Sequence, residues 1–222
     1  MRKDQLLQYY SKLASAYEIL LRRETRFLFL TSFLRLFVFL GGISFIWAGF
    51  NKSAPVGIFT VVVTLTIFFY LLYSYSRHTK KRDFYANLVI INRNELEAIS
   101  GDYSIFGSGD KYTDLSHDFS NDIDLFGTSS LFQYLNRTCT GHGSDMLAKW
   151  LSDPYSMSGQ LEERQKAIKE LAENDSWYQE FIAYGMLNPL KKADIDGFLT
   201  WIEEEDNSTQ GLFQKMTLYH MF

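Results

Sequence analysis

The stretch FLFLTSFLRLFVFLGGISFIWAGF, residues 27–50, is an almost unbroken apolar run, and a second run, APVGIFTVVVTLTIFFYLLY at residues 54–73, contains no charge. At about 1.5 Å rise per residue, a helix over either run covers the roughly 30 Å hydrocarbon layer of a bilayer. The short connection NKS, followed by Pro55, brings the second helix back antiparallel to the first. The pattern predicts a transmembrane helical hairpin; the alternative is a buried helical pair in a soluble protein.

Charges beside the two runs predict how the hairpin is oriented. Basic residues lie before the first run and after the second, at Arg22, Arg23, Arg26, Arg77, Lys80, Lys81 and Arg82. Because Lys and Arg near membrane ends stay on the cytoplasmic side, we expect both tails in the cytoplasm and only residues 51–55 on the far side. The single cysteine, Cys139, allows no internal disulfide and agrees with a reducing compartment.

One charge, Arg35, falls inside the first run. It is roughly 13 Å from the start of the span at helical rise, where a charge costs several kcal/mol unless it reaches headgroups or a partner. Neither run contains an acidic residue that an ion pathway would need. We therefore expect Arg35 to snorkel toward the cytoplasmic headgroups.

The segments that flank the hairpin carry helical stripes with spacings of three and four residues. The stripes are Leu6, Tyr10, Leu13, Tyr17 and Leu20 before it, and Tyr85, Leu88, Asn92, Leu96 and Ile99 after it. A hairpin brings these segments together antiparallel, which predicts packing within one chain. An intermolecular coiled coil is the alternative, but a seam of about two heptads is short for one.

Residues 101–125 have closely spaced Gly, Ser and Asp without a helical period. They predict a linker of loops, or a short strand pair around YSIFGSGDKYTD at residues 103–114. His117 with Asp118, Asp122 and Asp124 has no ligand-spaced His or Cys partner, so we expect these aspartates to cap turns rather than bind a metal.

The sequence of residues 126–222 predicts a second helical unit. Ser129 or Ser130 can cap a short helix that offers Leu131, Phe132 and Leu135 to a core, and Thr140 can cap the next helix, which ends at Asp153-Pro154. Gly143, inside that helix, predicts a closely passing backbone. Met146, Leu147, Trp150 and Leu151 form its apolar face. We expect Trp150 to be buried with Leu131, Leu147 and Leu171.

SLFQYLNRTCTGHGSDMLAKWLSDP, residues 130–154, resembles the segment that opens the core, or lever, domain of the MutS family of DNA mismatch-repair ATPases. The shared positions are Ser130, Leu131, Phe132, Leu135, Asn136, Arg137, Thr138, Thr140, Gly143, Leu147, Trp150, Leu151 and Pro154, and then Leu161, Arg164, Ala167, Ile168 and Leu171. A weaker likeness over residues 190–202 extends the resemblance to about residues 115–205. With the hairpin before it, the chain looks most like membrane-anchored MutS-related proteins of bacteria.

The apolar runs and the resemblance together predict a mainly α fold in which a transmembrane hairpin is followed by a helical bundle similar to the MutS core domain. The expected parts are a cytoplasmic amphipathic helix at 1–26, the hairpin at 27–75, a cytoplasmic helix at 76–100, a linker at 101–125 and an incomplete core domain at 126–222. Because the chain stops on an apolar tail, we expect it to be the N-terminal part of a longer protein.

MutS proteins hydrolyse ATP with a C-terminal P-loop domain, but G-x-x-x-x-G-K-[ST] does not occur in these 222 residues. The nearest fragment is GSGDK at residues 107–111. We therefore expect no catalytic, cofactor-binding or metal-binding residue here, with Cys139 as a small buried hydrophobe and His142 in a cap turn. The resemblance places ATP, magnesium and a possible homodimer contact in the missing C-terminal domain.

The net charge of the portion after the hairpin indicates whether it can bind DNA. Residues 77–222 contain 14 Lys and Arg against 23 Asp and Glu, so DNA contact through this portion is not expected. Two functions remain open. One is a MutS-like DNA-handling ATPase at the bacterial inner membrane, with both termini cytoplasmic and this chain supplying anchor and lever; the other is a non-enzymatic helical scaffold at that membrane.

Overall fold

The computed structural model describes residues 2–114, 116–153, 161–188, 197 and 200, and the statements below refer to these residues. The helices are α1 (Lys3–Lys52), α2 (Ala54–Ser100), the 3-10 helix η1 (Asp110–Tyr112), α3 (Leu131–Leu135), α4 (Gly141–Ser152), α5 (Leu161–Glu173) and α6 (Asp175–Leu187). No strand occurs in the described part of the chain. The prediction of a mainly α fold is confirmed.

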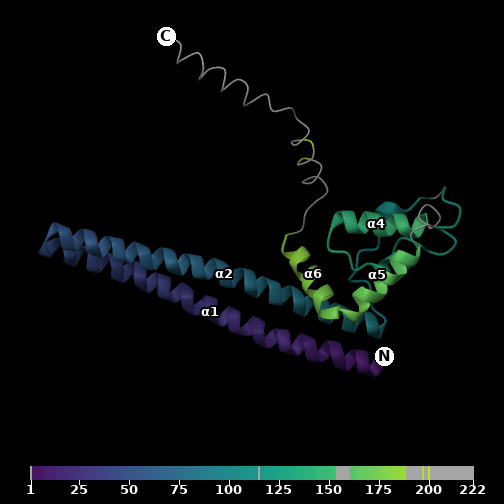
Figure 1. Ribbon diagram of the computed structural model, residues 1–222, viewed down its shortest axis with the longest axis horizontal. Coiled ribbons are helices and arrows are strands. Elements are labelled where there is room, and N and C mark those ends of the chain that lie inside the picture. The colour runs from purple at the N-terminus through teal and green to yellow at the C-terminus, as the bar shows by residue number, and fades with distance from the viewer. Residues whose placement is uncertain (1, 115, 154–160, 189–196, 198–199, 201–222) are drawn as a thin grey trace, which may run out of the picture.

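Helices α1 and α2 form a long antiparallel hairpin, and the smaller helices gather at the end where its two tails lie (Figure 1). Ser53 alone interrupts the helical path, with an extended backbone at φ −169° and ψ 154°. Pro55 follows in the first turn of α2, where its missing N–H has no intrahelical partner to lose. Each apolar run therefore continues without a break into its polar flank.

Small residues form the contact near the turn of the hairpin. A Cβ built on Gly49 would lie 2.8 Å from Thr60 Oγ1 and 3.2 Å from the Gly57 Cα, and one built on Gly42 would overlap the Thr64 methyl group. The backbones of the two helices therefore approach closely at these positions. Small residues are what allows two helix backbones to pack this closely.

Both long helices are long and apolar enough to cross a membrane. Only 11% of the most apolar window in each helix is buried, so most of its large side chains face outward. Phe37, Phe45 and Trp47 are at least 70% exposed. Insertion of this surface into a bilayer stays a prediction.

Arg35 reaches α2, where its guanidinium lies 4.2 Å from the ring centroid of Tyr75. The contacts of Gly42 with Thr64 and of Phe27 with His78 set the hairpin register, which places residue 35 level with residue 71. The side chain therefore extends by about one turn toward the tails. That is the direction expected for snorkelling, and the ring adds a cation–π partner.

The polar ends of α1 and α2 pack against each other and against α6. A buried cluster joins Leu88 and Ile91 of α2 to Ile182 and Ala183 of α6, and Tyr17 of α1 packs on its edge. The predicted packing within one chain is present, but the α2 stripe is divided between two partners. Asn92, a stripe residue, faces α6 and is fully buried there.

The predicted strand pair at residues 103–114 does not form, because turns and η1 wrap the segment around α3. The amide nitrogen of Phe132 donates to the Leu125 carbonyl (3.0 Å), and that of Gly127 donates to the Ser108 carbonyl (2.9 Å). Phe132 is 1% exposed and packs on the rings of Tyr112 and Phe126.

Ser130 and Thr140 cap α3 and α4 as predicted. Their hydroxyl oxygens accept hydrogen bonds from the backbone N–H groups of Gln133 and Gly143, both at 3.1 Å. Three interpretations of this helical unit are wrong, and the first concerns α3. Phe132 alone of the α3 apolar residues enters the core, since Leu131 and Leu135 are 42% and 43% exposed.

Gly143 faces the side chains of its own cap region rather than another backbone. A Cβ there would lie 3.1 Å from Thr140 Oγ1. Trp150 is half-buried beneath the Arg164 guanidinium, 4.3 Å from the ring centroid, whereas Leu171 is 41% exposed. The expected Trp150 core with Leu131 and Leu171 is therefore wrong.

Candidate functional site

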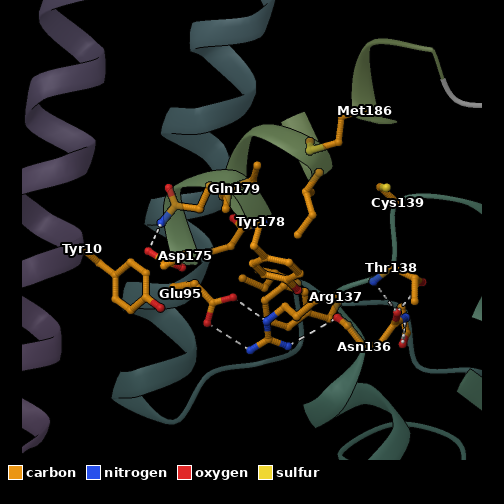
Figure 2. A pocket seen from close by; sticks show the side chains of 16 residues that line it. Tyr10, Glu95, Asn136, Arg137, Thr138, Cys139, Asp175, Tyr178, Gln179 and Met186 are labelled. Carbon is orange, nitrogen blue, oxygen red and sulfur yellow. Dashed lines mark hydrogen bonds and ion pairs between the residues drawn. The ribbon is translucent and has the colours of Figure 1, made fainter. Parts of the chain in front are cut away.

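A cavity lined by several hydrogen-bonded polar side chains lies where the hairpin meets the helical unit. The cavity, of about 220 Å³, is lined by five segments (Figure 2). They are α1, the end of α2, the linker, residues 136–139 before α4, and α6. Its polar side chains include Tyr10, Glu95, Arg137, Asp175 and Gln179. Five segments that are distant in sequence therefore meet in this junction.

Arg137 lies at the centre of the junction. Its Nε donates to Glu95 Oε1 at 2.5 Å and its Nη2 to Glu95 Oε2 at 3.3 Å (Figure 2). Its Nη1 donates to the Tyr134 carbonyl at 2.9 Å. The guanidinium also lies 3.6 Å from the ring centroid of Phe106. A two-point ion pair with a stacked ring holds the arginine in one orientation.

A side-chain turn fixes the backbone on both sides of Arg137. Asn136 Oδ1 accepts from the Thr138 N–H at 3.1 Å and from its hydroxyl at 2.7 Å, and Asn136 Nδ2 donates to the Gly107 carbonyl at 3.1 Å. Such local bonds replace the helical ones that end with α3. The tripeptide Asn136-Arg137-Thr138 thus aims the guanidinium at α2.

Cys139 follows this tripeptide and packs against α6. A Cβ built on Gly185 would overlap its sulfur atom, so the glycine leaves room for the thiol. The side chain is half-buried on the edge of the Leu88 cluster. Its surroundings are those of a packing residue.

A chain of hydrogen bonds joins α1, α6 and α2. The Tyr9 hydroxyl donates to Asp175 Oδ2 at 2.7 Å, Gln179 Nε2 donates to the same oxygen at 2.9 Å, and Asn92 Nδ2 donates to Gln179 Oε1 at 2.8 Å. The bond to Asp175 raises the pKa of Tyr9 to about 12, and burial raises the pKa of Tyr10 to about 12. Both phenols therefore stay neutral to a higher pH than an ordinary tyrosine does.

The remaining predicted positions serve local structure. His117 Nε2 lies 3.0 Å from the Ser152 carbonyl and ties the linker to the end of α4, and His142 is exposed in the first turn of α4. In the described ranges, no three His, Cys, Asp or Glu side chains are grouped to hold a metal ion.

The GSGDK fragment does not fit a phosphate ligand. Lys111 Nζ is bound to Asp145 at 3.1 Å and lies over the Tyr112 ring, and a Cβ on Gly109 would meet the Phe132 ring. Its lysine and glycine are thus used in packing η1 against α3 and α4, and residues 107–111 offer no nucleotide cradle.

Comparison with known proteins shows that residues 113–219 are similar to MutS domain III. The chain is also similar to the DNA mismatch repair protein MSH3 of Candida albicans, with 33% identity over 84 residues. That alignment covers 38% of this chain and 8% of the relative. No solved structure matches the chain significantly. The chain is thus similar, over part of its length, to MutS-type proteins.

The junction contains residues that sequence reasoning missed. Arg137 was recognised as part of the MutS-like motif, but its partner Glu95 lies before the matched segment, in the polar flank of α2. Tyr9, Asp175 and Gln179 were not singled out either. No spacing in the sequence links these residues, since Tyr9 and Asp175 are 166 positions apart.

Proposed function

We propose that this chain is the membrane anchor and the first part of the lever of a MutS-like protein. The whole protein would take part in ATP-dependent DNA mismatch binding and repair, or in related DNA handling. The observation that carries the proposal is the Arg137–Glu95 ion pair, which joins the MutS domain III segment to the long helix α2. Movement of one part would be transmitted to the other through this junction.

Insertion of the hairpin into a bilayer is supported by its outward-facing apolar side chains. A core helix of a soluble protein buries such residues, whereas only 11% of each apolar window is buried here. Basic residues at both tails favour cytoplasmic termini at an inner membrane. DNA and ATP would then lie on the same side as the lever.

Catalysis and DNA contact belong to other parts of the proposed protein. The 222 residues contain no P-loop, and the portion after the hairpin has a net negative charge, which opposes phosphate binding. We propose that ATP, magnesium and homodimer contacts are supplied by a C-terminal ATPase domain. This chain would position that domain near the membrane.

Single-cysteine labelling tests the anchor. In a Cys139→Ser background, a cysteine at Ser53 should react with a membrane-impermeant thiol reagent in intact cells. Cysteines at the exposed positions Ser11 and Ser176 should react only after lysis. Labelling of Ser176 from outside would place the lever away from DNA and ATP and contradict the proposal.

The reading frame beyond codon 222 tests the ATPase part. A P-loop followed by a Walker B strand is expected, and the protein encoded by the whole frame should hydrolyse ATP in a DNA-dependent manner. A frame without a P-loop would instead favour a scaffold without ATPase activity.

A further inference from the structure

A groove lies on the hairpin where the apolar run of α1 begins. It has a volume of about 580 Å³ and is lined by residues from the stretch 19–30 of α1 and by His78 of α2. Arg22, Arg23 and Arg26 come from the turns just before the apolar run, while Phe27 and Leu30 come from its first turn. The groove therefore crosses the boundary between polar and apolar surface.

The lining residues of α1 recur at helical spacing. Ile19, Arg23, Arg26 and Leu30 are spaced by four, three and four residues and so share one face of α1. The Phe27 ring packs on the His78 ring with centroids 4.0 Å apart, which fixes the floor of the groove against α2. On the membrane side of the groove, a ligand would pass from the guanidinium groups to the apolar side chains of Phe27 and Leu30, while Ile19 lies on the tail side of the arginines.

Nearby acidic groups leave the groove positive. Glu24 also lines the groove, but its Oε2 lies 2.6 Å from His78 Nδ1 and its side chain is 14% exposed, so its carboxylate is turned toward α2. Glu18 is bound to Arg93 at 2.6 Å and lies 3.8 Å from Arg22. Arg23 and Arg26 form no ion pair with the residues that the structure describes.

We propose that this groove binds an anionic phospholipid, with the headgroup phosphate at Arg22, Arg23 and Arg26 and an acyl chain along Phe27 and Leu30. Guanidinium groups donate paired N–H bonds to phosphate oxygens, and basic residues beside a span attract anionic lipids. A soluble phosphate would gain nothing from the two apolar side chains, whereas a lipid contacts both the guanidinium groups and these side chains. The site rests on the proposed insertion of the hairpin.

Electron spin resonance of spin-labelled lipids tests the site with the full chain in phosphatidylcholine bilayers. The protein should restrict the motion of spin-labelled phosphatidylglycerol in preference to spin-labelled phosphatidylcholine, with a relative association constant of about fivefold. This factor corresponds to roughly 1 kcal/mol from a basic residue near an anionic lipid. The triple variant Arg22→Gln, Arg23→Gln, Arg26→Gln should lose most of this preference and keep only the weak selectivity of the basic residues that remain on α2.

A matched variant separates the groove from diffuse charge. Arg77→Gln, Lys80→Gln, Lys81→Gln removes the same charge from α2 outside the groove lining and should keep the preference. Equal loss in both triple variants, or displacement of the labelled lipid by inorganic phosphate, would overturn the site. Equal restriction of both lipids by the unmodified chain would overturn the site alone. A chain that restricts neither lipid would overturn the membrane anchor together with the site.

Discussion

Arg137, just before α4, and Glu95, near the end of α2, form a two-point ion pair in which both side chains are 21% exposed. Arg93, two residues earlier on α2, forms an ion pair with Glu18 in which the arginine is 62% exposed. The same helix thus carries a half-buried ion pair to the helical unit and a more exposed one to α1. The two pairs differ in how strongly water screens them.

Glu95→Gln should lower the free energy of unfolding by about 2 kcal/mol, because it removes one charge from a half-buried, hydrogen-bonded pair. Arg93→Gln, the matched control, should cost less than about 1 kcal/mol, as exposed ion pairs do. Denaturant unfolding of the full chain in detergent micelles measures both. Equal losses would contradict the assignment of Arg137–Glu95 as the main polar tie.

Helix α1 should loosen from α6 in alkaline solution. The folded pKa of Tyr9 is raised to about 12 from 10.0, so the folded state disfavours the phenolate. The stability from its bond to Asp175 is therefore fully present below pH 10 and is lost as the pH rises toward 12. Tyr9→Phe should reduce the loss of folding stability between pH 9 and pH 12. This range runs from about one unit below the ordinary tyrosine pKa to the pKa of Tyr9 in the folded state. An unchanged pH profile would show that Tyr9 does not bond Asp175.

Phe132→Ala should cost roughly 3–5 kcal/mol, since this ring is 1% exposed among Tyr112 and Phe126. Leu131→Ala and Leu135→Ala, at neighbouring exposed positions of α3, should each cost less than about 1 kcal/mol. Thermal unfolding monitored by near-ultraviolet circular dichroism compares the three variants. A larger loss for Leu131→Ala would mean that α3 presents another face to its core.

Gly42→Ile should separate the two long helices near the turn, because a side chain there would overlap Thr64. The expected cost is about 1–3 kcal/mol, typical of overpacking. Gly41→Ile is the control, since a Cβ at Gly41 has no neighbour within 4 Å. The helicity of both variants during thermal unfolding in micelles gives the comparison. A Gly41 variant as unstable as the Gly42 variant would count against the close contact.

The hairpin and the helix caps could be predicted from the sequence because they depend on neighbouring residues. Two apolar runs separated by NKS and Pro55 leave α2 no path other than back along α1. The hydroxyl groups of Ser130 and Thr140 cap helices through bonds that span three residues. The MutS resemblance also came from local sequence, and the match over residues 113–219 supports it.

Only the tertiary structure decided which surfaces meet. The Arg137–Glu95 pair spans 42 positions, and the Asn92–Gln179 bond spans 87. Helical spacing shows which residues share a face but not whether that face meets α1, α6 or solvent; Asn92 faces α6, and Leu131 faces outward. Partners so far apart are set by how the helices pack, because burial and pairing depend on every element that reaches the junction at once.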